Sequence, residues 1–138
     1  MRMSNLTMIK IVEMLSAFSN KKLPQRISFA ITKNLMAINK EYQVYEIELK
    51  KILSEYSNDF ILDENNNPKC NNQGLPIVVE EKSEEYQNKI LELLNIEVDV
   101  DLYLIDLDCF DYDDRVGNYD SLSANEIATL QMVICKKG

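Results

Sequence analysis

The stretch that decides the fold runs from Gln25 to Tyr56 and reads QRISFAITKNLMAINKEYQVYEIELKKILSEY. Its apolar side chains recur at steps of three and four, with a mean close to the 3.6 residues of a helical turn. Neither glycine nor proline interrupts it. At about 1.5 Å per residue, a helix of this length extends about 48 Å. We therefore expect one long helix whose apolar stripe comprises Ile27, Ile31, Leu35, Ile38, Tyr42, Tyr45, Leu49, Ile52 and Tyr56.

The C-terminal half of this stripe carries tyrosines where the first half carries aliphatic residues. A compact domain of 138 residues has a radius of gyration of only about 14 Å, which is too small to cover the whole stripe. Tyrosine tolerates partial exposure and is favoured at interfaces. We expect an exposed surface that binds a protein partner or pairs two copies as a homodimer; in the alternative, the segment Phe60–Glu81 folds back over it. The predicted surface consists of Tyr42, Tyr45, Leu49 and Tyr56.

Shorter elements are expected on both sides of the long helix. The spacing of apolar residues predicts a helix over Leu6–Phe18 and a second over Glu84–Leu94, with Ser83 as its N-cap. Strict alternation predicts a half-buried strand from Ile96 to Leu104. Ser123 and Glu126 form a capping box that opens the last helix.

Residues Phe60–Glu81 are rich in the turn formers Asn, Gly and Pro, so we expect a hairpin or an irregular β segment there, without an internal repeat. Together the elements predict a single α+β domain, residues 1–138. It is mainly helical, with one long helix, shorter helices and a small antiparallel sheet from Phe60–Glu81 and Ile96–Leu107. Its core should contain Ile27, Ile31, Leu35, Ile38, Ile90, Leu94, Val98, Val100, Leu130 and Ile134.

Composition argues against several function classes. The chain has 23 acidic and 15 basic residues, a net charge of −8, which disfavours nucleic-acid binding because that rests on neutralising phosphates. Its three cysteines have no paired spacing, which indicates a reducing compartment. No apolar run suits a secretory signal or a membrane span, so we expect a cytoplasmic protein with no membrane role.

The sequence offers little catalytic apparatus. It contains no histidine, and neither Cys70 nor Cys135 has a base partner in view. The acidic stretch Asp106–Asp114 could hold a hard cation, but an EF-hand loop counted from Asp106 fails because Gly117 stands where the bidentate Glu is needed. A solvated acidic loop is the interpretation we favour. We expect no enzyme activity, no metal and no cofactor.

A small basic cluster is the one feature that favours a small ligand. Lys21, Lys22 and Arg26 lie near the start of the long helix, where main-chain N–H groups and the helix dipole attract anions. A signalling nucleotide held by these three residues is therefore an alternative function.

Four motifs occur in an order that resembles a known group of proteins. They are Lys22-Leu23-Pro24 before the long helix, the turn 63–68, the segment ELLNIEV at 92–98, and LSANEI at 122–127. These resemble the patterns KLPV, ELLNTEVEI and L(S/T)PAEL of small tailed-phage and prophage proteins whose function is uncharacterised. The resemblance covers about Lys21 to Val133, but the acidic segment Asp106–Asp120 departs from it.

The resemblance implies a phage or prophage origin and an accessory role in the host cytoplasm. It implies no catalytic residues. We therefore expect a non-enzymatic accessory protein that binds a host or phage macromolecule, for example to block a host defence or to assist virion assembly.

Overall fold

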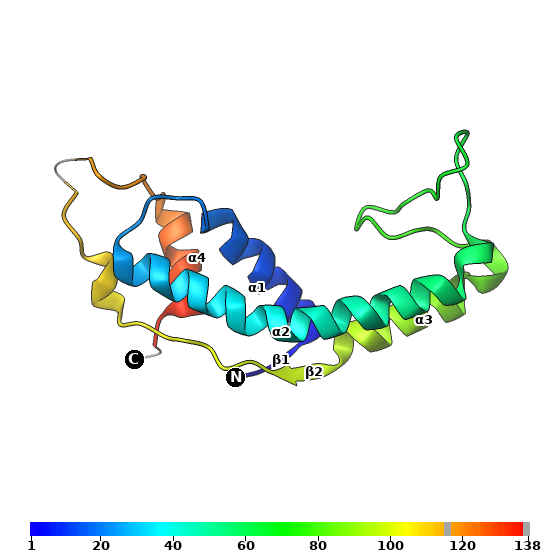
Figure 1. The fold of residues 1–138 in the computed structure, drawn as a ribbon, viewed down its shortest axis with the longest axis horizontal. Helices are drawn as coiled ribbons and strands as arrows, with labels where there is room; N and C mark the ends of the chain where they lie inside the picture. The colour runs from blue at the N-terminus through cyan, green and yellow to red at the C-terminus, as the bar shows by residue number, and fades with distance from the viewer. Residues whose placement is uncertain (115–116, 137–138) are drawn as a thin grey trace. The chain divides into compact units, whose positions relative to one another are not determined.

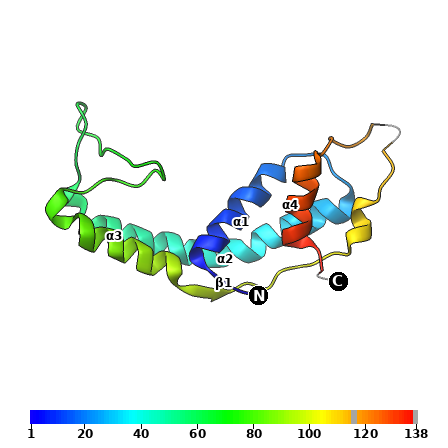
Figure 2. The same ribbon diagram turned by 180° about the vertical axis from the view of Figure 1, so that it is seen from behind.

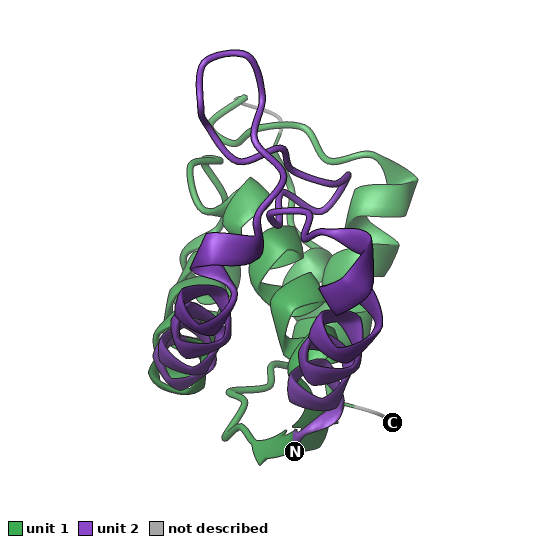
Figure 3. Ribbon diagram, turned by 90° about the vertical axis from the view of Figure 1, so that its right-hand side faces the viewer, with its two compact units in different colours: residues 1–42, 97–138 green, residues 43–96 purple. Residues whose placement is uncertain are grey.

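The computed structural model describes residues 1–114 and 117–136, which divide into two compact units. Unit 1 comprises residues 1–42 and 97–138, and unit 2 comprises residues 43–96; Figure 3 colours them separately. The long helix α2, Gln25–Glu55, contributes residues to both. Because two units that share a helix do not reveal whether either folds alone, the single domain stays a prediction.

Helices dominate both units (Figures 1 and 2). The predicted mainly helical α+β class is confirmed, and the predicted long helix is confirmed to within one residue. In chain order the elements are β1 Arg2–Ser4, α1 Asn5–Phe18, α2 Gln25–Glu55, the 3₁₀ turn η1 Ser57–Asp59, α3 Glu80–Asn95, β2 Glu97–Asp99, the 3₁₀ turn η2 Leu107–Phe110 and α4 Ala124–Ile134.

The sheet of unit 1 differs from the predicted one. β1 pairs antiparallel with β2, with Met3 opposite Val98, so the first residues of the chain supply a strand that we did not anticipate. Residues 60–78 form only isolated β-bridges, because most of this segment is folded into tight turns. The strand expected from Ile96 to Leu104 is confined to Glu97–Asp99, since β1 offers only three residues to pair with.

The core of unit 1 forms where α1, α4 and the first part of α2 meet. Figure 1 shows α1 and α4 above this part of α2 and the extended segment after β2 below it. Within unit 1 the prediction is wrong for Leu35 and Val98, which are only half-buried. Met8 and Leu15 of α1 are fully buried but were not predicted. The predicted core residues that are buried in this unit are Ile27, Ile31, Ile38, Val100, Leu130 and Ile134.

The capping box at the start of α4 is confirmed. The Glu126 N–H donates to Ser123 Oγ (3.1 Å), and the Ser123 N–H donates to Glu126 Oε1 (2.9 Å). This second bond, from the main chain, is the largest cause that lowers the pKa of Glu126 below its ordinary value. Local side-chain chemistry therefore sets where the last helix begins.

The core of unit 2 lies between the second part of α2, α3 and the segment that joins them. Tyr56 and Tyr86 pack edge to face with centroids 5.2 Å apart, and the Tyr56 hydroxyl donates to a carboxylate oxygen of Glu85 (2.9 Å). Lys89 pairs with Glu55 and places its ammonium over the Tyr56 ring. The buried cluster comprises Tyr56, Val78, Tyr86 and Ile90, with Leu49, Ile52, Leu53, Phe60, Leu75 and Leu94 packed against it.

The predicted interaction surface on α2 is largely covered. Tyr45 and Tyr56 are buried, and Leu49 packs against the cluster of unit 2. The expected exposure is wrong for Tyr45 and Tyr56; Tyr56 packs with Val78 of the segment after α2 and with Tyr86 and Ile90 of α3. Tyr42, in unit 1, is half-buried.

Helix α3 begins one turn earlier than predicted. Its N-cap is Val79, without a side-chain cap, and two acidic residues in the first turn face the positive end of the helix dipole. Ser83 lies inside the helix, where its hydroxyl accepts a hydrogen bond from Gln87. Leu94, predicted in the core, is half-buried beside the unit 2 cluster.

The segment 61–78 contains an eight-residue repeat that we did not recognise in the sequence. Asp63 Oδ1 accepts from the N–H groups of Asn65 and Asn67, and eight residues later Asn71 Oδ1 accepts from the N–H groups two and four positions on. Asn66 (φ 62°) and Gly74 (φ 79°) adopt the same left-handed conformation in the two copies. The repeat therefore has the form (Asp/Asn)-x-x-(Asn/Gly)-x-Pro.

Three residues that are also eight positions apart connect the two turns through main-chain hydrogen bonds. The Ile61 N–H donates to the Ile77 carbonyl, the Ile77 N–H to the Lys69 carbonyl, and the Lys69 N–H to the Ile61 carbonyl, each at 2.8 Å. This closed ring satisfies main-chain groups without forming a regular sheet. It explains why the segment makes only isolated bridges.

The left-handed position of the second turn gives a stability prediction. A Cβ at Gly74 would meet no atom within 4 Å, so Gly74→Ala tests backbone conformation alone. We expect a loss of about 1 kcal/mol in the free energy of unfolding, because a non-glycine residue with φ near +80° is strained. Urea denaturation followed by circular dichroism measures it. The matched change Gln73→Ala, one residue earlier, should cost less than half as much, and equal losses would contradict the assignment.

Candidate functional site

A fully buried asparagine on α2 positions the candidate site in unit 1. The Tyr103 N–H donates to Asn34 Oδ1 (2.6 Å), and Asn34 Nδ2 donates to the Tyr103 carbonyl (2.9 Å). The amide group thus makes the two hydrogen bonds with the Tyr103 main chain that a neighbouring β-strand would make in a sheet. Because Asn34 is 0% exposed and satisfied at both amide atoms, it fixes Tyr103 against the helix.

Tyr103 and Phe29 form an exposed aromatic pair. Their ring centroids lie 5.4 Å apart at 74°, the edge-to-face arrangement that aromatic rings prefer. The Lys33 ammonium lies 5.6 Å from the Phe29 centroid and 5.0 Å from the Tyr103 centroid. Phe29 is 49% exposed and Tyr103 39% exposed, so both rings also face solvent.

A shallow depression of about 390 Å³ adjoins the aromatic pair. Its size is near the low end of the range of about 300–1,000 Å³ typical of ligand pockets. Ile105 is held in its wall by a parallel bridge to Cys135, with the Ile105 N–H donating to the Ile134 carbonyl (2.8 Å). The depression is lined by Gln25, Arg26, Phe29, Tyr103, Leu104, Ile105, Asp106 and Lys136. We call the exposed group Arg26, Phe29, Lys33, Tyr103, Leu104 and Lys136 the Phe29 patch.

The charged groups of the patch are mainly positive. Arg26 is exposed, and within residues 1–114 and 117–136 it has neither a hydrogen bond nor an ion pair from its side chain. Lys136 Nζ lies 3.5 Å from Asp106 Oδ1, and both side chains are more than half exposed. An ion pair this exposed is worth at most about 1 kcal/mol, so Lys136 can exchange Asp106 for another anion.

The predicted anion site is only partly assembled. Lys21 lies 3.6 Å from a carboxylate oxygen of Glu126. The Lys22 main chain is tied to Asp120, whose carboxylate accepts from the Lys22 N–H (2.6 Å) and whose N–H donates to the Lys22 carbonyl (2.7 Å). Of the three predicted residues, Arg26 lines the depression.

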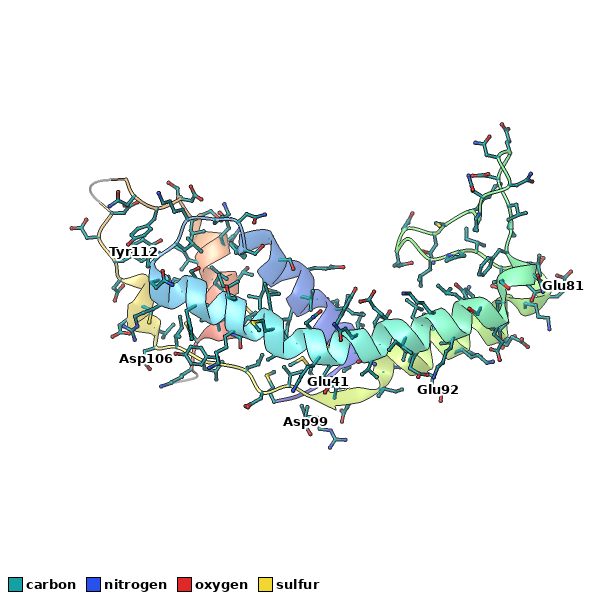
Figure 4. The ribbon with its side chains drawn as sticks, viewed as in Figure 1. Glu41, Glu81, Glu92, Asp99, Asp106 and Tyr112 are labelled. Carbon is teal, nitrogen blue, oxygen red and sulfur yellow. The ribbon has the colours of Figure 1, made fainter. Side chains whose placement is uncertain are left out.

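The acidic stretch Asp106–Asp120 includes residues 115–116, which lie outside the described residues. In the described part, Asp114 accepts main-chain hydrogen bonds from Asn118 (2.6 Å) and Tyr119 (3.2 Å), which close the loop. Figure 4 shows Asp106 and, earlier in the same segment, Asp99 on the lower side of unit 1. No group of three or more His, Cys, Asp or Glu side chains suited to a metal is gathered in the part of the chain that the structure describes.

The cysteines are in two different environments. Cys70 is exposed in the repeat segment, whereas Cys109 and Cys135 are buried in unit 1. Burial is the largest cause that raises the pKa of the Cys135 thiol, and the neighbouring Cys109 and Asp106 add to it. Since the thiolate is the reactive form, Cys135 is held in its unreactive form near neutral pH.

Comparison with known protein families, curated proteins and solved structures finds no match, so the phage relationship stays a prediction. Across the described residues, no helix combines the length and apolar character needed to cross a membrane.

The residues of the patch were absent from the sequence predictions, Arg26 excepted. Two irregularities could have revealed them. Phe29 lies on the side of α2 opposite its apolar stripe, where Met36, two turns later, is 71% exposed. Tyr103 is the one aromatic residue on the polar side of the alternation that runs from Ile96 to Leu104. Large apolar residues on a polar face indicate an interaction surface.

Asn34→Ala tests the link between α2 and Tyr103. Removing the amide leaves two main-chain groups without partners, so we expect the free energy of unfolding to fall by about 1–3 kcal/mol. Asn39→Ala, on an exposed position of the same helix, is the matched control and should change stability by less than about 0.5 kcal/mol. Thermal and urea denaturation measure both. Equal stability of the two variants would show that Asn34 does not hold Tyr103 in solution.

Proposed function

We propose that this chain is a non-enzymatic accessory protein that binds another protein through the Phe29 patch. The observation that carries the proposal is the exposed pair of Phe29 and Tyr103, held in place by the buried Asn34 and bordered by cationic side chains.

Apolar surface that is exposed to water in the free protein would contribute favourable free energy when a partner covers it. Covering the exposed half of Phe29 would contribute on the order of 2 kcal/mol, and Met36 offers a second exposed apolar side chain on the same face of α2. Phe, Tyr, Met and Arg are the side chains that protein interfaces concentrate at their centres. Phe29 is also anchored on a helix, so little conformational entropy is lost when a partner covers it.

The biological setting is supported by the sequence resemblance alone. A phage or prophage origin would place the protein in the host cytoplasm, where blocking a defence enzyme or assisting virion assembly both require protein binding. Either role is compatible with a binding surface and needs no catalytic group.

Sequestration of a nucleotide draws less support. Of Lys21, Lys22 and Arg26, only Arg26 lines the depression, and Lys21 is already paired with Glu126. The open surface around Phe29 suits a macromolecule that covers it better than a small ligand that must be enclosed.

Affinity capture tests the proposed function. Tagged protein expressed in the host bacterium should recover one partner at a stoichiometric ratio. The double change Phe29→Ser and Met36→Ser should lower recovery at least about tenfold, because truncating a central anchor costs about 2 kcal/mol or more. Met132→Ser, which alters an 82% exposed methionine of α4, is the matched control and should leave recovery unchanged. Recovery of the protein alone, or equal recovery with every variant, would contradict the proposal.

A further inference from the structure

The sign of the charge at the Phe29 patch is opposite to that of the whole chain. The chain carries a net charge of −8, yet the charged side chains that line the depression are Arg26 and Lys136 against the carboxylate of Asp106, and the Lys33 ammonium lies over the two aromatic rings beside it. A positive apolar surface attracts an acidic segment. Because the net negative charge on the rest of the chain repels acidic partners, this patch is the surface at which an acidic segment is favoured.

The three cations are available to a ligand in different ways. Arg26 has no partner among the described residues, so its planar guanidinium can take a carboxylate with two parallel hydrogen bonds. Lys136 is held by one exposed ion pair of 3.5 Å. Lys33 lies over both aromatic rings, where a carboxylate that approaches the rings would also approach its ammonium.

We infer that the Phe29 patch binds an acidic peptide segment that carries one large apolar or aromatic side chain. This inference rests on the proposed function and names the chemistry of the partner. The apolar side chain enters the depression of about 390 Å³ against Phe29, Tyr103 and Leu104. Carboxylates that flank it in the segment pair with Arg26 and Lys136, and Lys33 adds a third positive charge at the aromatic edge.

A nucleic acid would fit the patch less well. It would bring one phosphate for each nucleotide, and a strand that extends past the patch would meet Asp99, Asp101 and Asp108 on the segment 97–110. An acidic peptide can place its few carboxylates only where the cations are. Charge density therefore favours a peptide over a polyanion.

Selection from a library of random 12-residue peptides tests the inference. Sequences that bind the wild-type protein but not Phe29→Ala should be enriched in Asp and Glu around one aromatic or large aliphatic residue. In fluorescence anisotropy, Arg26→Gln should weaken the selected peptide about tenfold, because it removes a two-bond, charge-assisted contact. Lys136→Gln should weaken it up to about fivefold, because the ion pair of this lysine is exposed. Lys10→Gln, an exposed lysine of α1, is the matched control and should leave affinity unchanged.

Selected peptides without excess acid, affinity that does not change in Arg26→Gln, or a labelled single-stranded RNA that binds in a Phe29-dependent way would overturn the inference. Enrichment of neutral apolar peptides that need Phe29 would leave the proposed protein binding intact. A captured partner retained by the Phe29 and Met36 double variant would remove the proposed function itself. Circular dichroism and an amide correlation spectrum of each variant exclude unfolding as the cause.

Discussion

The pair of hydrogen bonds between the Asn34 side chain and the Tyr103 main chain is the constraint on which the candidate site depends. The segment after β2 is not part of a sheet at Tyr103, so without Asn34 its main-chain groups would lack partners in the described structure. With Asn34 in place, the chain runs against α2, and the Tyr103 ring meets Phe29. One buried polar side chain thus converts an irregular segment into the wall of a surface depression.

The regular parts of the fold could be predicted from the sequence because their determinants are local. The 3.6-residue period located α2, and the Ser123–Glu126 pair located the start of α4. The partner of β2 could not be predicted, since Arg2–Ser4 has no strand pattern of its own and pairs across most of the chain. The eight-residue repeat was missed because its copies share conformational roles, carried by Asp63 and Asn71 and by Asn66 and Gly74, and of the repeat's defining positions only the proline is identical.

The candidate site was missed for a related reason. The apolar stripe of α2 led us to expect an exposed surface at its tyrosines, but Tyr45 and Tyr56 are buried. An amphipathic pattern shows which face of a helix is apolar. It does not show whether other segments of the protein cover that face. The informative residues were Phe29 and Met36, which stay exposed on the opposite face, where burial in the core does not explain an apolar side chain.

Amide hydrogen exchange at Tyr103 tests the central claim most directly. Tyr103 is 39% exposed and lies outside every helix and strand, so ordinary loop behaviour would give fast exchange. If its N–H donates to the buried Asn34, its protection should approach that of the Ile31 amide in α2, while the neighbouring Leu104 N–H, which has no partner among the described residues, should exchange quickly. Equal and fast exchange of Tyr103 and Leu104 would contradict the account.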